Sequence, residues 1–283
     1  MTTKKIWFVT GASKGLGLTL VQQLLAEGYA VAATSRNLAE LTQAVSTATD
    51  SFLPLHMDLS SETSVQQAIA TTISTLGGLD VVVNNAGYGQ LGGLEEITDQ
   101  EARQNFEVNV FGLLNVLRYA TPHLREQRSG RVFNISSIAG YTGNFPGWGI
   151  YCGTKFAVAG LTESYAAEMK DFGVHATVVY PGYFRTEFLA NGSLGTPKNP
   201  IAAYQSIRDS QAWHQQQMAG NQPGDPVKAA HVLIQISEAE NPPVHLFLGE
   251  DANQLAAQKI AEVQQDLQQW QAVASATSFE VVA

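Results

Sequence analysis

The chain has 283 residues, of which 45% are hydrophobic and 14% are charged, and its formal net charge is −9. A chain with this apolar content can bury a large core, which excludes general disorder. Its net negative charge argues against nucleic acid and anionic membranes as partners. The single cysteine, Cys152, excludes an intramolecular disulfide and a cysteine-based metal cluster. We see no signal peptide and no apolar run of the ~18 residues that a membrane span needs, and we expect a cytoplasmic protein.

Short apolar runs alternate with longer stretches of helical periodicity. Strands are expected at residues 6–10, 30–34, 52–57, 81–83, 132–135, 176–180 and 245–248. Helices are expected near residues 15–27, 38–45, 62–76, 99–127, 150–171, 226–238 and 252–270. This alternation predicts one α/β domain over residues 1–283, a doubly wound, Rossmann-like, seven-stranded parallel sheet with helices on both faces. Such sheets bind ligands at the carboxyl ends of the strands, where the strand order reverses.

The pattern changes near residue 190. Residues 190–226 are rich in Gly, Pro and Asn around a short helical stretch at 201–218, and we interpret them as a variable lid over the substrate or as plain surface loop. Asp225 and Pro226 predict the N-cap and the first position of the next helix. Residues 271–283 lack helical periodicity and predict a loose tail, although the FEVV stretch could pair with a sheet edge.

A glycine-rich loop, TGASKGLG, follows the first expected strand and opens a helix. Glycines in such a loop permit a tight turn, a close backbone approach to a pyrophosphate, and close packing of helix on strand, while the helix N-terminus attracts the phosphates. An ordinary strand-to-helix turn is the alternative, but the flanking strand and helix favour a dinucleotide site. The candidate binding residues in this loop are Gly11, Ser13, Lys14, Gly15, Leu16 and Gly17.

The end of the second expected strand indicates which dinucleotide binds. An acidic residue there would bond to the ribose 2′-hydroxyl of NAD, but this chain has Arg36 and no acid before Glu40. Arg36 can pair with a 2′-phosphate, with Lys14 in the same region, so the sequence favours NADP. After the third strand, Asp58, followed by Leu59, could accept a hydrogen bond from the adenine amino group, or it could cap the next helix.

Tyr151 and Lys155 lie four positions apart in YCGTK, at the start of an expected helix, and so share one helix face. A lysine cation about 5 Å from a phenol, at an effective dielectric near 20, lowers the phenol's pKa by roughly two units. Tyr151 could then exchange a proton with a substrate oxygen near neutral pH. An exposed surface pair is the alternative interpretation.

Two further sets of polar residues are expected near this pair. Ser136 and Ser137 end the fifth strand, where a hydroxyl could hold a substrate oxygen; we prefer Ser137, and a serine turn is the alternative. Asn109 interrupts an expected helix, where asparagine is unfavourable. It could bind a water that links Lys155 to bulk solvent, or make a structural contact that bends the helix.

The segments TGASKGLG, NNAG, Asn109, SSIAG, YCGTK and PGYFRT occur in one order, and over residues 4–190 they strongly resemble the short-chain dehydrogenase/reductase family. The chain looks most like NADP-dependent carbonyl reductases and 17β-hydroxysteroid-dehydrogenase-like oxidoreductases. The resemblance implies a tetrad of Asn109, Ser137, Tyr151 and Lys155, with Tyr151 and Lys155 also touching the cofactor. It implies that Thr186 binds the nicotinamide carboxamide, and that a homodimer or homotetramer forms through helices near 99–127 and 150–171. Further cofactor contacts are expected from Asn85, Ala86, Gly87, Pro181, Gly182 and Phe184.

These residues predict an enzyme that transfers a hydride between NADP(H) and a carbonyl or secondary alcohol. A hydrophobic or aromatic substrate pocket is expected from Tyr88, Tyr141, Phe145, Trp148, Tyr183, Phe184 and Phe188. The alternatives are a nucleotide-sensing protein without turnover, an epimerase or dehydratase on the same scaffold, and a 3-oxoacyl-thioester reductase. We expect no metal site, because the six histidines lack ligand spacing; His214 and three others are assigned to solvent or helix packing.

Overall fold

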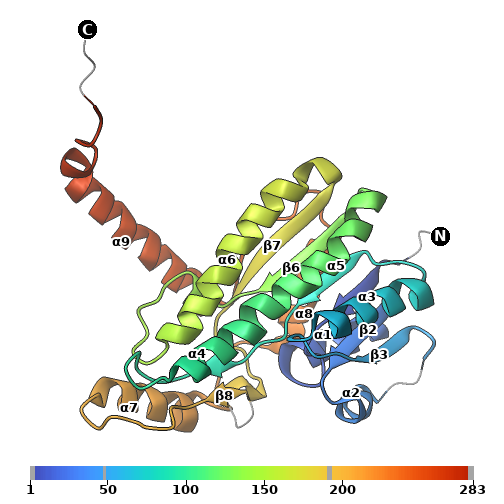
Figure 1. Ribbon diagram of the computed structural model, residues 1–283, viewed down its shortest axis with the longest axis horizontal. Coiled ribbons are helices and arrows are strands. Elements are labelled where there is room, and N and C mark those ends of the chain that lie inside the picture. The colour runs from blue at the N-terminus through green and yellow to red at the C-terminus, as the bar shows by residue number, and fades with distance from the viewer. Residues whose placement is uncertain (1–3, 47–48, 190–192, 280–283) are drawn as a thin grey trace.

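The computed structural model describes residues 4–46, 49–189 and 193–279 (Figure 1). Its main sheet has seven strands in the order β3-β2-β1-β4-β6-β7-β9, and every neighbouring pair is parallel. These strands are β1 (Ile6–Val9), β2 (Ala30–Ser35), β3 (Phe52–His56), β4 (Val81–Asn84), β6 (Gly130–Ile135), β7 (Val174–Pro181) and β9 (His245–Leu248). The predicted fold class is therefore confirmed, and the strand order reverses between β1 and β4.

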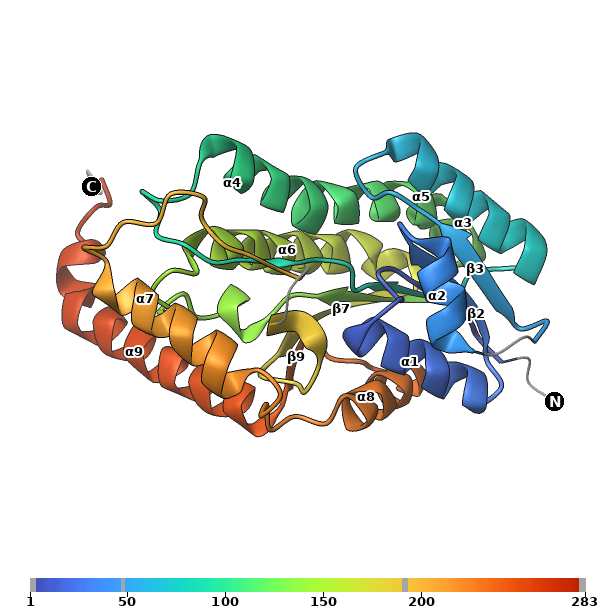
Figure 2. The ribbon, with the colours of Figure 1, turned by 90° about the horizontal axis from the view of Figure 1, so that it is seen from below.

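Helices cover both faces of this sheet (Figures 1 and 2). On one face, side chains of β1, β2 and β4 pack with α1 (Gly15–Ala26), α2 (Leu38–Val45) and α8 (Pro226–Glu238). On the other, alternate side chains of the same strands pack with α3 (Glu62–Leu76), α5 (Gly112–Gln127) and α6 (Gly149–Met169). Trp7 belongs to the first cluster and its neighbour Phe8 to the second, because successive side chains in a strand point to opposite faces. Both are fully buried, as a sheet with two covered faces requires.

The single helix expected over residues 99–127 is divided into three parts. It consists of α4 (Asp99–Phe106), the π-helical turn η1 (Glu107–Phe111) and α5, which continues to Gln127. Thr98 caps α4 with a capping box, in which its side chain accepts from the Glu101 amide and the Glu101 side chain accepts from the Thr98 amide. The π-helical turn contains Asn109, and such turns inside α-helices often occur at functional sites.

Residues 193–225 form part of the wall of the main cavity, to which they contribute Ser193, His214 and Gln222. Their strand β8 (Leu194–Gly195) pairs with β5 (Gly89–Gln90) in a small parallel sheet that we did not predict. The short helix expected at 201–218 is α7 (Gln205–Ala212), which continues into the π-helical turn η5 (Trp213–Met218). As predicted, Asp225 caps α8 by accepting a hydrogen bond from the Val227 amide, and Pro226 is its first residue.

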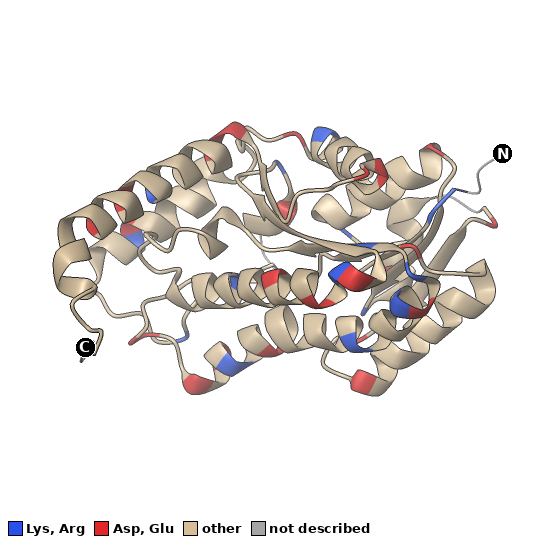
Figure 3. Ribbon diagram, turned by 90° about the horizontal axis from the view of Figure 1, so that it is seen from above, with Lys and Arg blue, Asp and Glu red and all other residues tan. Residues whose placement is uncertain are grey.

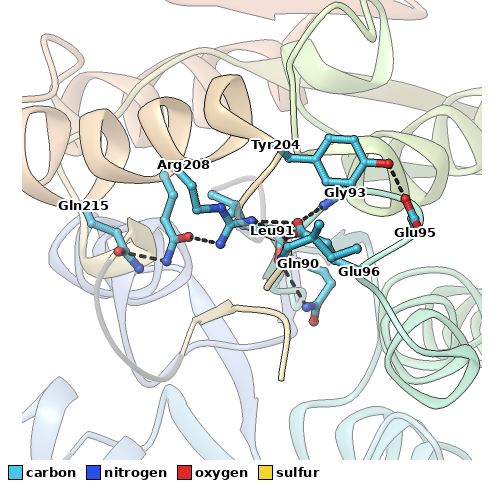
Figure 4. A network of polar contacts seen from close by, with 10 residues as sticks. Gln90, Leu91, Gly93, Glu95, Glu96, Tyr204, Arg208 and Gln215 are labelled. Carbon is cyan, nitrogen blue, oxygen red and sulfur yellow. Dashed lines mark hydrogen bonds and ion pairs between the residues drawn. The ribbon is translucent and has the colours of Figure 1, made fainter. Parts of the chain in front are cut away.

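A buried ion pair joins this segment to the loop after β5 (Figure 4). The Glu96 carboxylate has no exposed surface and accepts two hydrogen bonds, of 2.6 and 2.7 Å, from Nη2 of Arg208 on α7. It also accepts from the backbone amides of Gly93 and Ile201. Beside it, the Tyr204 hydroxyl bonds to Glu95. These contacts hold α7 in one position against the body of the domain.

The last helix, α9 (Glu250–Ala274), extends beyond the body of the domain (Figure 1). It is longer at both ends than the helix expected over 252–270, so residues 271–274, which we assigned to a loose tail, are helical. Most of the FEVV stretch lies outside the described residues.

Residues 4–46, 49–189 and 193–279 contain no helix that combines the length and apolar character needed to cross a bilayer. Nor do they contain a group of three or more His, Cys, Asp or Glu side chains placed to hold a metal ion.

Lys and Arg are interspersed with Asp and Glu over the helices in Figure 3.

Candidate active site

A cavity of about 670 Å³ lies at the carboxyl ends of the strands and runs from the glycine-rich loop to Tyr151. This is where the topology predicts a ligand, because the helices that follow β1 and β4 diverge there. The predicted residues that line it are Gly11, Ser13, Lys14, Gly15, Leu16, Arg36, Asp58, Leu59, Asn85, Ala86, Gly87, Ser137, Tyr151, Lys155, Pro181, Gly182, Phe184 and Thr186. Of the predicted cofactor and tetrad residues, only Gly17 and Asn109 lie behind this wall.

The glycine-rich loop is held against the end of β4 by a network of backbone contacts. The Thr10 hydroxyl oxygen accepts from the backbone amides of Asn85 and Ala86, both at 3.0 Å. The Asn85 side chain donates to the carbonyl oxygens of Thr10 and Gly11. Gly17 fits beneath this network, because a Cβ there would clash with the Asn85 side chain. Thr10 was quoted in the motif but not singled out, although its position before the first glycine was a usable signal.

The loop has the properties of a dinucleotide cradle. Gly11 and Gly15 have φ angles of +65° and +61°, which L side chains rarely adopt. Lys14 is the N-cap of α1 and makes no side-chain capping bond, so the first amides of the helix remain available for an anion. The residues present therefore fit a pyrophosphate.

The region after β2 and β3 is open and carries one cation. Arg36 is exposed, lines the cavity and is close enough to Asp58 to help lower the pKa of that carboxyl. The largest cause of this lowered pKa is the hydrogen bond from the Ser60 hydroxyl, 2.7 Å from Oδ1. The N-cap of α3 is Ser61, so the alternative role of Asp58 as that cap is wrong.

On the opposite side of the glycine-rich loop, the segment after β7 completes the cavity wall. A Cβ on Gly15 would lie 3.7 Å from Cβ of Thr186, which places Thr186 next to the helix N-terminus. The Thr186 carbonyl oxygen accepts from the Gln222 side chain, a fully buried residue that sequence analysis missed. Pro181, Gly182 and Phe184 line the cavity between these positions.

Tyr151 and Lys155 are the central polar pair of the cavity. Both lie in the first turns of α6, and they are 6% and 5% exposed, so the alternative of an exposed surface pair is wrong. The Lys155 Nζ atom lies 5.7 Å from the centre of the Tyr151 ring and donates to the Ile135 carbonyl oxygen at 2.9 Å. The predicted juxtaposition on one helix face is present.

The pKa of Tyr151 differs from our expectation. We expected Lys155 to lower it, but burial raises the pKa of this phenol, and the hydrogen bond with Ser137 only partly opposes the rise. Burial also lowers the pKa of Lys155 to about 8. The reason is that the site withdraws both groups from water, and this penalises the phenolate and the ammonium alike.

The two serines after β6 have different surroundings. The Ser136 hydroxyl is buried and donates to the backbone carbonyl oxygen of Lys155 at 2.8 Å. Both serines line the cavity, but Ser137 accepts from the Ala139 amide and lies close enough to Tyr151 to help lower the pKa of that phenol. Ser137 is therefore the serine that faces Tyr151, as we preferred.

Asn109 lies in the π-helical turn, and both donors of its side-chain amide are used. Nδ2 donates to the Tyr88 carbonyl oxygen and to Thr154 Oγ1, while Oδ1 accepts from the Tyr88 amide. A Cβ on Gly87 would lie 3.0 Å from this Oδ1 and 3.5 Å from Lys155 Nζ. The absence of a side chain at Gly87 therefore leaves Asn109 and Lys155 facing one small space.

Aromatic side chains surround the rest of the cavity. Tyr88, Phe145, Trp148, Tyr183, Phe184 and Phe188 line it as expected. Tyr141 does not; it packs against Tyr180 and Phe247, so its assignment to the pocket is wrong. His214 was assigned to solvent or helix packing, but it is 6% exposed and lines the cavity. Only the tertiary structure brings η5, and with it His214, to the site.

Cys152 follows Tyr151 but points into the packing of α6 and does not line the cavity. Burial raises the pKa of its thiol to about 11, so it stays protonated at neutral pH. Cys152 is therefore a packing residue.

Fold and cavity together define a nucleotide-binding α/β protein with a buried tyrosine–lysine pair. The family model described as short chain dehydrogenase matches residues 5–195. The chain belongs to the short-chain dehydrogenase/reductase family. It is thus an oxidoreductase of a family that uses a nicotinamide cofactor.

Several relatives resemble the chain over most of its length. Oxidoreductase BOA17 of Botryotinia fuckeliana is 34% identical over 92% of this chain and 93% of its own length. A 3-ketodihydrosphingosine reductase of Bacteroides thetaiotaomicron is also 34% identical, over 87% of this chain and 88% of its own. A 3-oxoacyl-[acyl-carrier-protein] reductase of Staphylococcus aureus is 37% identical over 65% of this chain and 76% of its own.

Solved structures give the same assignment. A short-chain dehydrogenase from Streptomyces avermitilis superposes with a TM-score of 0.88 at 33% identity, covering 97% of this chain and all of that one. ElxO with NADP bound has a TM-score of 0.71 at 27% identity, covering 87% of this chain and 97% of the other.

Proposed function

We propose that the protein reduces a ketone or aldehyde to an alcohol with NADPH. The observation that carries this proposal is the buried Tyr151–Lys155 pair, with Ser137 beside it, in a cavity continuous with the glycine-rich loop. When bound, the cofactor supplies the hydride that reaches the carbonyl carbon. The chain binds the two reactants, excludes water and supplies the proton.

The cofactor would extend from Arg36 to Thr186. The amides of the glycine-rich loop and of α1 hold the pyrophosphate, and Asn85, Ala86 and Gly87 support the adenosine side. Asp58 and Leu59 would contact the adenine, and Lys155 the nicotinamide ribose. Arg36 selects the 2′-phosphate, because it is an exposed cation at the end of β2, where a site for NAD would carry an acidic residue. Binding of NADP by ElxO supports this choice.

Tyr151 donates the proton to the substrate oxygen. Its raised pKa keeps the phenol protonated at neutral pH, which is the form that reduction consumes. Ser137 holds the substrate oxygen by hydrogen bonding. As hydride adds to the carbon, the phenol O–H bond breaks and the alcohol O–H bond forms. Lys155, with a pKa of about 8, is mostly protonated at pH 7 and stabilises the phenolate.

Tyr151 must then regain a proton from solvent. Asn109 and Lys155 face the space above Gly87, which is where we place a relay water. The second lone pair of Asn109 Oδ1 is the acceptor for that water, since both Nδ2 donors are occupied.

The substrate would be a hydrophobic or aromatic carbonyl compound, held by the aromatic wall and covered by residues 193–225. Reduction of 3-oxoacyl thioesters is a second candidate, favoured by the likeness to the Staphylococcus aureus reductase.

We place the enzyme in the cytoplasm as a homodimer or homotetramer. Exposed Phe111 and Phe156, on η1 and α6, support an interface there.

The test is consumption of NADPH and of NADH against aliphatic, aryl and steroid ketones and a 3-oxoacyl thioester. We expect NADPH-dependent reduction of bulky ketones. Tight NADPH binding with no oxidation by any of these compounds would replace the enzyme proposal with a nucleotide-sensing role.

A further inference from the structure

His214 and Tyr183 form a hydrogen-bonded pair in the wall of the cavity. His214 Nε2 lies 2.9 Å from the Tyr183 hydroxyl, and both residues line the cavity. They come from η5 and from the loop after β7, which are 31 positions apart in sequence. The mechanism above uses neither residue.

The backbone fixes which atom of this pair donates. His214 Nδ1 lies 2.7 Å from the Ser210 carbonyl oxygen, which can only accept, so Nδ1 carries the ring proton. Burial lowers the pKa of His214, so the ring stays neutral at pH 7. Nε2 is then an acceptor, and the Tyr183 hydroxyl donates its only proton to it.

Tyr183 is left with the lone pairs of its hydroxyl oxygen. Burial raises the pKa of this phenol to about 12, so it remains neutral. A neutral phenol whose proton is already donated can only accept a hydrogen bond from a ligand. The pair thus presents an acceptor to the cavity and no donor.

The surroundings of the pair are aromatic. The rings of Trp148 and His214 have centres 4.8 Å apart, and those of Trp213 and Tyr183 form a T-shaped pair with centres 5.8 Å apart. Trp148 also contacts Tyr151, the proposed proton donor, at 5.6 Å. Tyr183 and Tyr151 line the same cavity. One substrate can therefore reach both phenols.

We propose that Tyr183, oriented by His214, is a specificity site for a hydrogen-bond-donating group on the substrate, a hydroxyl or N–H separate from the carbonyl that is reduced. In an aromatic pocket, a single placed acceptor decides which way round a ligand binds. The favoured substrates are hydroxyketones or aminoketones rather than plain ketones. The inference rests on the proposed function for its substrate class, and it concerns recognition, not hydride transfer.

The test compares aryl ketones that carry a hydroxyl at successive ring positions with analogues that carry a methoxy group at the same position. Affinity for the NADP⁺ complex is measured by calorimetry, and kcat/KM with NADPH by absorbance. In the wild type, we expect at least one hydroxyl compound to exceed its methoxy analogue by about fivefold in both measurements, as one neutral hydrogen bond provides.

Two variants and a control test whether Tyr183 and His214 cause this preference for the hydroxyl compound. Tyr183→Phe should bring that ratio close to one. His214→Phe leaves the Tyr183 proton free to donate to a methoxy oxygen. The ratio of the hydroxyl compound to its methoxy analogue should therefore fall. Tyr141→Phe is the matched control, because Tyr141 packs against Tyr180 and Phe247 outside the cavity, and it should keep the wild-type ratio.

The outcomes separate the two proposals. If no hydroxyl position is favoured, or if Tyr183→Phe keeps the preference, the specificity site does not exist. If hydroxyl compounds bind preferentially but no cofactor is oxidised, the proposed function fails while the recognition site stands.

Discussion

The Ser136 hydroxyl donates a hydrogen bond to the backbone carbonyl oxygen of Lys155 across 2.8 Å. Gly140 permits this contact, because a Cβ there would clash with the Ser136 hydroxyl and with the Lys155 carbonyl group. The end of β6 is thus joined to the first turns of α6, and Ser137 is turned toward Tyr151. Both serines line the cavity, but Ser136 holds the helix and Ser137 lies next to Tyr151.

The two serines therefore provide a matched pair of variants. Ser137→Ala should lower kcat by about 10²-fold, since it removes a hydrogen bond to the developing oxyanion. Ser136→Ala should retain turnover and cost about 1 kcal/mol in the free energy of unfolding. Steady-state kinetics and urea unfolding check both. The reverse pattern would assign the substrate contact to Ser136.

Tyr151→Phe should abolish ketone reduction and leave NADPH binding nearly intact. The substitution removes only the hydroxyl that gives the proton, and the ring still packs on Trp148. Turnover and NADPH fluorescence titration measure the two effects, with Tyr141→Phe as the control. Ketone reduction at the wild-type rate would remove Tyr151 from the mechanism.

Arg36→Asp should shift the preference from NADPH toward NADH. The change removes the proposed partner of the 2′-phosphate and adds a carboxylate that can bond to the ribose hydroxyl. The ratio of kcat/KM for the two cofactors measures this, with exposed Arg125→Asp on α5 as the control. An unchanged ratio would show that Arg36 makes no phosphate contact.

Lys155→Met should inactivate the enzyme and stabilise its fold. Burial lowers the pKa of Lys155 from 10.5 to about 8, so its charge destabilises the folded state by about 3 kcal/mol. Loss of the hydrogen bond to Ile135 offsets about 1 kcal/mol of the gain, leaving about 2 kcal/mol at pH 7.

The pH dependence of the free energy of unfolding tests whether the charge on Lys155 destabilises the folded state. Between pH 8 and 10.5 the unfolded lysine binds more protons than the folded one, so the wild-type free energy of unfolding should rise with pH. Urea unfolding at pH 7, 8 and 9 should show the advantage of Lys155→Met decreasing across this window. A constant difference would contradict the lowered pKa.

Glu96→Gln should release the segment that carries α7. The carboxylate accepts all four of its hydrogen bonds, so an amide nitrogen there meets another donor and leaves the partly buried Arg208 poorly paired. Breaking a buried pair costs about 3 kcal/mol. We expect a raised KM for the ketone and faster tryptic cleavage at Lys198. Neighbouring Glu95→Gln is the control: Glu95 is exposed, and the amide oxygen of Gln can still accept from the Tyr204 hydroxyl, so this variant should be cleaved at the wild-type rate.

Acid should weaken the same contact. Burial alone would raise the pKa of Glu96, but hydrogen bonds from Gly93 and Ile201 and the charge of Arg208 hold it below its usual value. Its contribution is therefore present above the pKa of the unfolded chain and is lost as the pH falls through the lower, folded value. At each pH, the tryptic cleavage rate of the wild type is compared with that of Glu96→Gln. The ratio of the two rates should approach one as the pH falls, and a pH-independent ratio would contradict this.

The sequence by itself determined the seven strands, the glycine-rich loop and the Tyr151–Lys155 pair. These depend on local periodicity and on spacing within one element, which neighbouring residues dictate. Only the tertiary structure decided that α4 and α5 are divided by a π-helical turn at Asn109, that Glu96 pairs with Arg208, and that His214 faces the cavity while Tyr141 does not. It also decided the pKa of Tyr151, because desolvation depends on what surrounds a group rather than on the residue four positions away. Contacts between distant segments and burial are properties of the folded chain as a whole, so no spacing along the sequence specifies them.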